Sequence, residues 1–529
     1  MLLLAGFCGF LFFFGMAYFG LVGADEPRYA QVAREMLARH DWITPMLGGS
    51  PWLEKPPLFY WQAMLAYSFF GVSDWAARLP SAVDATLLVV AVYAFLRRFR
   101  SGYHLDGALI TASAAGIIGF ARAASTDMPL AAMLAIALLA WFAWSEHGSK
   151  LLLALGYVAL ALATLAKGPV ALLLAGATVV IFAAAQGEYT LIRRTLWIPG
   201  ILLFCAVALP WYVAVQIRNP DFFHIFILQH NLARFGSNLY RHKEPFWYYI
   251  PVAILGLMPW TVFASAALGE RVRAWWQRRE ALGSENAFSV FLVIWLMVPV
   301  AFFSISQSKL PGYIVPALPA ATLLLAEYVR ERLSESDRPA RMLVILHAVV
   351  AASPLIPGLM IQYIILQHHM PWGRAAAISC LLAGVLAIGI AVAMRVQMGW
   401  NGLRFVTLVP VVLTVAAVLR LGGPALDSTL SARPLAAELS QVETKALPLA
   451  VLHVSRELEF GLAFYRNQTI ERYELGQVPS TEHLLVAPEG TQVEIAKRVT
   501  GRRVTYLGSF APQGMDYYWV AAASGKEQP

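Results

Sequence analysis

Long apolar runs recur through most of the chain, and they constrain its fold more than any other feature. A helix needs about 20 mainly apolar residues to cross the hydrocarbon core of a bilayer. Such runs lie near 2–22, 78–96, 105–121, 128–145, 150–166, 169–185, 196–215, 250–268, 287–305, 312–329, 341–366, 374–394 and 404–421. We therefore predict an all-α membrane protein with about 13 transmembrane helices. The two runs on either side of Lys167-Gly168-Pro169 could instead form one re-entrant hairpin.

The composition agrees with this class, because 59% of the residues are hydrophobic and only 14% are charged. Soluble proteins have about 25% charged residues. The net charge of +8 is better explained by basic loops on the cytoplasmic side than by nucleic-acid binding. Cys8, Cys205 and Cys380 all lie in apolar runs, which argues against a disulfide framework or a cysteine zinc cluster. Residues 2–22 have no basic start and no small-residue cleavage site, so we interpret them as a retained first span.

Basic clusters predict the orientation of the loops. Arg97-Arg98-Phe99-Arg100, Arg193-Arg194 and the segments 271–279 and 330–341 fall on one side of the membrane under this count of spans. The positive-inside rule makes that side the cytoplasm. The opposite, periplasmic face of a bacterial inner membrane would then carry the loops that contain Asp25, Lys55, Asp127, His230 and Lys309.

The C-terminal residues change in character and predict a second domain. We expect a membrane domain over 1–423, with a first periplasmic loop at about 23–77, and a small periplasmic α/β domain over 424–529. Patterns of strands and helices support this. The predicted strands are 447–455, 483–487, 503–510 and 517–523, and the predicted helices are 431–442 and 491–499. This domain has no phosphate-binding glycine loop, so we expect a supporting or recognition role.

The first outer loop begins with an acidic pair, Asp25-Glu26, followed by Pro27. Proline suits the first position of a helix, and the apolar stripe that follows is typical of an interfacial helix lying on the bilayer. The two acids could simply cap this helix and complement its dipole. Alternatively, they present a carboxylate at membrane depth, with Asp25 as a general base and Glu26 as a substrate contact.

Further along the same loop comes Glu54-Lys55-Pro56-Pro57. Lys55 could snorkel to lipid phosphate. It could instead hold the phosphate of a lipid substrate and stabilise the negative charge that develops as this phosphate departs. Asp127, after the third span, could be a helix N-cap or a second acid that contacts the substrate.

Two later outer loops carry more groups suited to phosphate and sugar. The segments 229–235 and 241–249 combine imidazole, guanidinium and aromatic side chains, among them Arg241 and Tyr248. Arginine grips phosphate in bidentate fashion, although an aromatic girdle at the membrane interface would look similar. Lys309 and Tyr313, in a tight hairpin, could reach the same phosphate. Glu54 and His230 could together hold a divalent metal ion.

These motifs resemble those of the integral-membrane GT-C glycosyltransferases, in the group of protein O-mannosyltransferases and aminoarabinose (lipid A) transferases. The resemblance covers about 1–420 through the span pattern. Four motifs carry it: Asp25-Glu26-Pro27-Arg28-Tyr29-Ala30, Glu54-Lys55-Pro56-Pro57, residues 230–235 leading to Pro245-Phe246-Trp247-Tyr248-Tyr249, and Lys309-Leu310-Pro311-Gly312-Tyr313. The lipid A enzymes commonly have a small residue where Pro57 stands, and this difference leaves the sugar and the acceptor open.

The resemblance implies a polyprenyl (undecaprenyl) phosphate sugar donor and inverting transfer to lipid A or another envelope acceptor, such as a protein hydroxyl. It implies that Asp25 is the catalytic carboxylate and that Asp127 is a second acid of the cavity. Lys55, Arg234 and Tyr313 would hold the polyprenyl phosphate. Glu54 with His230 would correspond to a metal pair, for zinc or for magnesium or manganese, although the scheme requires no cofactor.

Two other classes of protein compete with this interpretation. A lipid transporter or flippase would also have many spans, but it usually places charges or broken helices near the midplane. Here the charges gather at one end of the predicted bundle, with Lys167 as the exception. A structural scaffold would explain the aromatic belts but not several costly charges on one face.

Overall fold

The computed structural model describes residues 1–233, 244–277, 287–334, 339–361 and 371–523. The chain forms two compact units, and each is made of separate stretches of sequence. The helical unit comprises Met1–Phe14, Leu53–Gln62 and Arg78–Val418. The mixed unit comprises Gly15–Trp52, Ala63–Ala77 and Leu419–Pro529.

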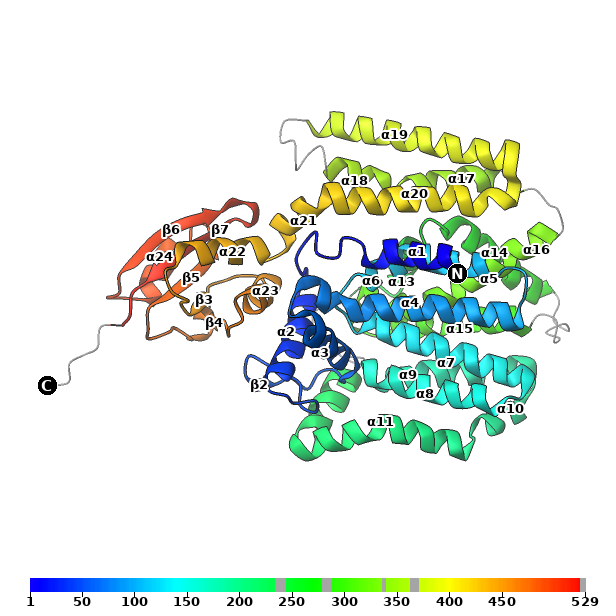
Figure 1. Cartoon of the computed structure of the whole chain (residues 1–529), viewed down its shortest axis with the longest axis horizontal. Helices are drawn as coiled ribbons and strands as arrows, with labels where there is room; N and C mark the ends of the chain where they lie inside the picture. The colour runs from blue at the N-terminus through cyan, green and yellow to red at the C-terminus, as the bar shows by residue number, and fades with distance from the viewer. Residues whose placement is uncertain (234–243, 278–286, 335–338, 362–370, 524–529) are drawn as a thin grey trace. The chain divides into compact units, whose positions relative to one another are not determined.

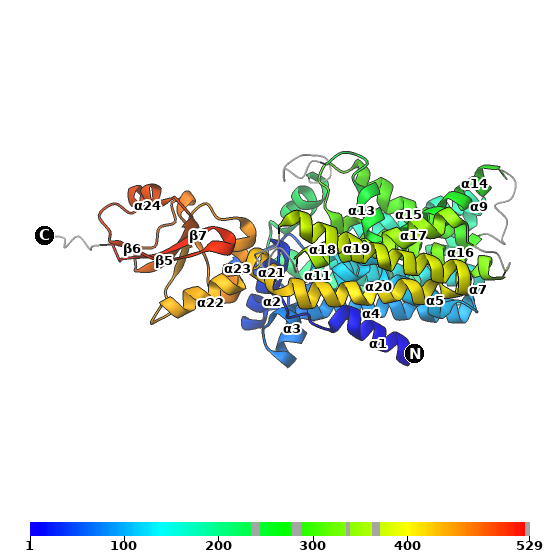
Figure 2. The same cartoon turned by 90° about the horizontal axis from the view of Figure 1, so that it is seen from above.

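The helical unit is a bundle of membrane-length helices (Figures 1 and 2). Its elements are α1 (Leu2–Cys8), η1 (Gly9–Phe13), the start of α3 (Leu58–Phe70), most of α4 (Asp74–Phe99), α5 (His104–Ser113), α6 (Ala115–Ala121), α7 (Asp127–His147), α8 (Lys150–Lys167), α9 (Val170–Gln186), α10 (Tyr189–Thr195), α11 (Ile198–Arg218), η2 (Phe223–Ala233), α13 (Tyr249–Gly256), α14 (Thr261–Gln277), α15 (Ala287–Ile305), η4 (Pro311–Ala317), α16 (Leu318–Ser334), α17 (Arg341–Ala352), α18 (Leu355–Ile361), α19 (Trp372–Val392), η6 (Ala393–Met398), η7 (Gly399–Gly402) and α20 (Leu403–Ala417). Within it, α8 packs between α7 and α11, and α17 to α20 pack on one another.

The predicted membrane class is confirmed. In the described part of the chain, nine helices are long and apolar enough to cross a membrane, and two bent helix pairs raise this number to as many as eleven. The shorter apolar helices Leu2–Phe13 and Val170–Gln186 fill the two remaining predicted runs. Because α8 alone is long enough to cross the membrane, the structure favours two separate helices over a single hairpin around Gly168.

Three predicted spans differ from the expectation in shape. The run 2–22 is helical only as far as Phe13, because Phe14 is extended and Gly15 has φ +68°. The run 105–121 is bent by 65° between α5 and α6. The run 250–268 is bent by 120° between α13 and α14, beside Pro259, which has no N–H to continue a helix.

Aromatic side chains fill the centre of the helical unit. Phe142 of α7 packs against Phe291 of α15 with ring centres 4.7 Å apart, and Trp141 stacks on the same ring at 5.9 Å. Each large aromatic side chain buries roughly 150–250 Å² of surface. This packing holds α7, whose first residue is Asp127, against its neighbours.

The mixed unit contains a five-stranded sheet, a separate two-stranded sheet and several helices. Its elements are α2 (Asp25–Ala38), β1 (Met46–Leu47), β2 (Ser50–Pro51), α21 (Gly423–Leu430), α22 (Arg433–Val442), β3 (Leu449–Val451), α23 (Arg456–Arg466), β4 (Glu471–Arg472), β5 (His483–Pro488), α24 (Gln492–Arg498), β6 (Val504–Phe510) and β7 (Met515–Val520). β1 pairs with β2, and the strand order of the five-stranded sheet is β4-β3-β5-β7-β6. β3 is parallel to β4 and β5, whereas β7 is antiparallel to both of its neighbours.

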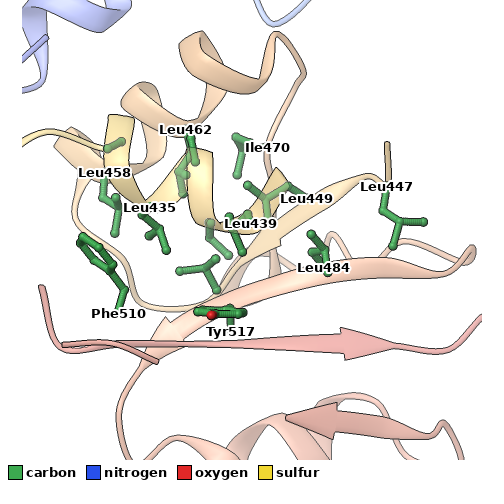
Figure 3. Close-up of a cluster of buried hydrophobic side chains, with 14 residues drawn as sticks. Leu435, Leu439, Leu447, Leu449, Leu458, Leu462, Ile470, Leu484, Phe510 and Tyr517 are labelled. Atoms are coloured by element: carbon green, nitrogen blue, oxygen red, sulfur yellow. The ribbon is translucent and has the colours of Figure 1, made fainter. Parts of the chain in front are cut away.

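Helices α22 and α23 cover one face of this sheet. Figure 3 shows Leu435 and Leu439 of α22 pointing toward Leu484 and Tyr517 of the strands, with Leu462 of α23 beside them. All the predicted strands and helices of this region are present, so the predicted small α/β fold is confirmed. Helix α23 and strand β4 were not predicted.

The first loop and the C-terminal residues belong to one unit, which no sequence pattern predicted. Helix α2 packs against α23, and the Arg34 guanidinium donates to the Phe464 carbonyl oxygen over 2.8 Å. The Leu21 N–H donates to the Tyr465 hydroxyl over 2.7 Å. The C-terminal part of the unit begins at Leu419, near the predicted boundary at 423.

Candidate functional site

Asp127 lies at the start of α7 and is held by two donors. The Lys167 ammonium donates to its Oδ1, and the Ser125 hydroxyl donates to its Oδ2 over 2.8 Å. The N-cap of α7 is Thr126, whose side chain makes no capping hydrogen bond, and Asp127 is the first residue of the helix, so the capping alternative for Asp127 is wrong. Its carboxylate instead accepts an ion pair in a largely buried position, since the side chains of Lys167 and Asp127 are 10% and 15% exposed.

Lys167 is the functional candidate that the sequence reasoning passed over. It is the last residue of α8, and the chain turns directly after it at Gly168, which has φ +87°. The turn brings the end of α8 to the start of α7. A lysine at the end of an apolar run, followed by Gly-Pro, was the available signal. The charge therefore joins the cluster around Asp127.

Tyr313 and Gly312 approach the same ion pair from η4. The Lys167 ammonium lies 4.6 Å from the centre of the Tyr313 ring, which is a cation–π distance. A Cβ added to Gly312 would lie 2.7 Å from the Asp127 carboxylate carbon, so only glycine lets the η4 backbone approach this closely. The hairpin that the sequence singled out is thus in contact with Asp127.

Glu54 and Lys55, from the motif just before α3, also belong to this cluster of charged side chains around Asp127. The Lys55 ammonium has a favourable electrostatic interaction with the Asp127 carboxylate. The Glu54 carboxylate lies 3.6 Å from Nε2 of His230, on η2, and these side chains are 20% and 8% exposed. Residues from five regions of the sequence therefore come together in the helical unit: 54–55, 125–127, 167, 230 and 312–313.

Glu54 and His230 offer two donor atoms to a metal ion. Protein sites for zinc usually supply three or four ligands. Within the described ranges, no group of three His, Cys, Asp or Glu side chains is arranged to hold a metal ion. The pair is compatible with a weakly held ion that completes its shell with water or substrate, and its metal role stays a prediction.

Lys309 and Arg122 donate hydrogen bonds to backbone carbonyl oxygens. The Lys309 ammonium, 6% exposed, donates to the carbonyl oxygens of Ser306 over 2.6 Å and Glu244 over 3.1 Å. The Arg122 guanidinium donates to the carbonyl oxygens of Leu11 and Phe14, over 3.0 and 2.8 Å. Burial, with repulsion from Arg78, lowers the pKa of Arg122 to about 10. In this structure both cations fix chain segments beside the cluster.

The aromatic loop is described from Glu244 onward. The Tyr248 ring lies 5.1 Å from the Tyr249 ring, and the Tyr249 hydroxyl donates to the Leu310 carbonyl oxygen over 3.2 Å. These contacts join the loop to the Lys309 hairpin. Two predicted substrate-binding residues, Arg234 and Arg241, lie outside the described residues.

The acidic pair of the first loop lies in the mixed unit, and its two members differ. Glu26 is buried and accepts the Val22 N–H over 2.8 Å. Asp25 forms an ion pair with Arg28, but its side chain stays 48% exposed. Arg28 lies 5.1 Å from the centres of both the Tyr29 and Trp52 rings, which hold it in place. Asp25 therefore offers an accessible, oriented carboxylate, whereas Glu26 stabilises the start of α2.

A family model, Dolichyl-phosphate-mannose-protein mannosyltransferase, matches residues 2–226. Among relatives, an undecaprenyl phosphate-alpha-4-amino-4-deoxy-L-arabinose arabinosyl transferase from Pseudomonas aeruginosa is 33% identical over 341 residues, which cover 63% of this chain and 60% of that protein. The protein of the same name from Edwardsiella ictaluri is 29% identical, over 69% of this chain and 66% of that protein. The chain thus spans less than two thirds of the length of these relatives.

Solved structures extend the comparison to nearly the whole chain. The crystal structure of ArnT from Cupriavidus metallidurans bound to undecaprenyl phosphate is similar with a TM-score of 0.79. Sequence identity is 23%, and the match covers 98% of this chain and 97% of that one. The apo form matches with a TM-score of 0.76. The chain is therefore a multi-pass membrane protein with the fold of ArnT, and the predicted resemblance to the aminoarabinose transferase and protein O-mannosyltransferase group is confirmed.

Proposed function

We propose that this protein is an inverting glycosyltransferase that uses a polyprenyl phosphate sugar donor at the periplasmic face of a bacterial inner membrane. The acceptor of first choice is lipid A, with aminoarabinose as the sugar. Two relatives are named for that donor chemistry, and the similar crystal structure holds undecaprenyl phosphate. A protein hydroxyl or another envelope glycan is the second choice, because the mannosyltransferase model matches the N-terminal residues.

One observation carries the proposal. Lys55, Lys167 and Tyr313 gather around a single carboxylate, Asp127, in the helical unit. Lys55 is half-buried and the Lys167 side chain is 10% exposed, so two ammonium groups lie near one acid in partly buried positions. Cations placed in this way are suited to a phosphate. Preorganised groups of this kind stabilise the charge that develops on a leaving group, and removing one oxyanion-hole donor in other enzymes costs about 2.7–4 kcal/mol.

The reaction follows from these groups. The donor phosphate binds to Lys55 and Tyr313, with Arg234 as a further predicted contact. An acceptor oxygen attacks the anomeric carbon on the side opposite to the phosphate. The new carbon–oxygen bond forms as the bond to the phosphate breaks, and polyprenyl phosphate leaves. Asp25 takes the acceptor proton as general base, a role that typically contributes about 10²–10⁴-fold in rate. No step is routed through a metal ion.

The position of Lys167 also bears on the transporter alternative. Its charge had seemed to lie apart from the others, yet it pairs with Asp127 at the end of the helices. Charges that gather at a helix end suit surface chemistry better than transport through the midplane.

The experiment is a transfer assay with the full chain in detergent. Defined polyprenyl phosphate sugars and lipid A are supplied, and the product is identified by its mass. The wild type should add one sugar to lipid A, whereas Asp25→Asn should fold and lose transfer by at least about 10²-fold. A matched control is Glu489→Gln, an exposed acid beyond β5. Full activity of Asp25→Asn would remove Asp25 as the base.

A second arm examines the phosphate site and the acceptor. Lys55→Ala should raise the KM for the donor or lower kcat, while an unchanged kcat/KM would exclude Lys55. Transfer to a peptide hydroxyl but not to lipid A would support the second choice of acceptor. Movement of the donor across vesicle membranes without any glycosylated product would contradict the enzyme assignment. Labelling of a cysteine placed beside Lys55 from the cytoplasmic side would contradict the orientation.

A further inference from the structure

A groove opens along α4, α7 and α8 at the end of the helical unit opposite to Asp127. Its volume is about 710 Å³, within the range of about 300–1,000 Å³ that is typical of small-molecule sites. Asp127 and His147 are the first and last residues of α7. A helix of this length spans roughly 30 Å. The groove is therefore separate from the candidate site.

The groove is apolar along most of its length. Its floor is buried and includes Phe95, Leu139 and Ala143. One wall is formed by Leu151 and Leu155, which are 80% and 48% exposed. In a membrane protein, exposed leucines on a long apolar helix face lipid. The groove is therefore open to the hydrocarbon region from the side.

The polar lining groups gather at one end, where three helix ends meet. Arg98 lies in the last turn of α4, His147 ends α7, and Ser149 precedes α8. Arg98 is exposed, its guanidinium carbon lies 5.7 Å from the centre of the Phe99 ring, and it forms no ion pair within the part of the chain that the structure describes. The nearby acid Glu146 is already bound by Arg100 over 2.5 Å, and it lies 4.0 Å from His147. This end of the groove therefore presents a guanidinium to an anion.

An apolar channel with a basic end matches one class of ligand, an amphiphile with a fatty chain and an anionic head. We propose that the groove binds an anionic glycerophospholipid of the leaflet that contacts the basic loops. The phosphate would contact Arg98, and an acyl chain would lie along Leu139 and Leu155. Basic pockets between membrane helices are suited to such head groups, and arginine can bind a phosphate through two parallel hydrogen bonds.

The proposal does not depend on the transferase assignment. The donor phosphate is assigned to Lys55, at the other end of α7, so the groove serves a second lipid. This lipid would hold α4, α7 and α8 together at their basic ends, where Ala94 and Ala140 leave space between the helices.

The test uses native mass spectrometry of the delipidated full-length protein titrated with phosphatidylglycerol. The wild type should bind one molecule at least fivefold more tightly than phosphatidylcholine of the same chains. Arg98→Ala should weaken this binding about fivefold, since one basic residue near a lipid surface contributes about 1 kcal/mol. Arg97→Ala is the matched control, because Arg97 is exposed in the same helical turn but does not line the groove.

A second variant probes the apolar part. Ala94→Trp places a large side chain at the exposed edge of the groove and should abolish the tight site, with size-exclusion behaviour confirming the fold. If that variant does not fold, a photo-crosslinking residue at position 155 should capture phosphatidylglycerol instead. Equal losses in Arg97→Ala and Arg98→Ala would overturn the proposal, as would equal binding of phosphatidylcholine. Displacement of the lipid by stoichiometric polyprenyl phosphate would assign the groove to the donor and would also overturn it.

Discussion

The Tyr465 hydroxyl donates to the Asp74 carboxylate over 2.6 Å, although these residues are 391 positions apart in the chain. Arg433 binds the other oxygen of Asp74 over 2.7 Å and also binds Asp427 over 2.7 Å. The same tyrosine oxygen accepts the Leu21 N–H. This network joins the first loop to the C-terminal residues, and it stabilises the unit that contains Asp25.

We expect Tyr465→Phe to destabilise the mixed unit. A hydrogen bond to a charged group contributes about 1.5–3 kcal/mol, and the variant would leave the Leu21 N–H without its acceptor. Thermal unfolding followed by tryptophan fluorescence should show a lower Tm for the mixed unit. Tyr506→Phe, on the exposed side of β6, is the matched control and should leave the Tm unchanged. Equal Tm values for the two variants would contradict the importance of this network.

The same tyrosine predicts a pH dependence. Burial raises the pKa of Tyr465 above its ordinary value of 10.0, and the nearby Asp74 carboxylate raises it further. A raised pKa means that the folded state favours the neutral phenol, so this contribution to stability is complete below pH 10 and falls as the pH rises above it. The Tm difference between wild type and Tyr465→Phe should be constant from neutral pH to about pH 9 and should shrink at more alkaline pH. A difference that shrinks below pH 8 would contradict this assignment.

We expect Lys167→Met to lower both stability and transfer. Removing one partner of a buried ion pair typically costs about 3–5 kcal/mol, because the remaining charge is unpaired. The double variant Asp127→Asn with Lys167→Met removes both charges and should recover much of the lost stability without recovering transfer. Unfolding in a denaturant series measures the first effect, and the lipid A assay measures the second. If the double variant is no more stable than the single one, the two residues do not act as a pair.

Gly312→Ala should disturb the same site sterically. The new methyl group would lie 2.7 Å from the Asp127 carboxylate carbon and 2.9 Å from Phe120. Overpacking of this kind typically costs about 1–3 kcal/mol. Gly384→Ala in α19 is the control, since nothing lies within 4 Å of its added Cβ and alanine is the better helix former. The KM for the donor should change, and the Tm should fall, only in Gly312→Ala, and unchanged values in that variant would show that the loop can move aside.

The core of the sheet should be sensitive to truncation. Leu484→Ala removes a side chain that is 1% exposed between α22 and the strands (Figure 3). Such substitutions cost about 2–5 kcal/mol, so the variant should unfold at lower denaturant concentration. Val493→Ala, at a position that is 70% exposed, should behave like the wild type.

Local features of the fold could be predicted from the sequence, because a membrane helix is specified by its own length and hydropathy. The same is true of the strands 483–487 and 503–510, whose patterns are continuous. The first span was predicted too long, since composition did not reveal the extended residue at Phe14 or the left-handed Gly15. Helix α23 was missed even though Ser455 accepts the Leu458 N–H and Asn467 ends the helix with φ 51°.

Contacts between residues far apart in the sequence could not be predicted from local sequence patterns. The neighbours of Asp127 come from α8 and η4 as well as from the segment before α3, and no local rule links these segments. Motif resemblance identified Lys55 and Tyr313, which lie in recognisable short sequences. It did not include Lys167, because this lysine lies outside the four motifs and was interpreted as an exception among the charges at one end of the bundle.

The bond between Leu21 and Tyr465 joins residues that are 444 positions apart, and it constrains how the protein is made. Ribosomes add roughly 5–20 residues per second, so roughly 20–90 s separate the synthesis of the two partners. During that interval the first loop has left the ribosome but has no β-sheet domain to pack against. The region around Asp25 is therefore completed last, and a polypeptide that stops short of its end would insert into the bilayer while the loop that carries Asp25 still lacks its packing partners.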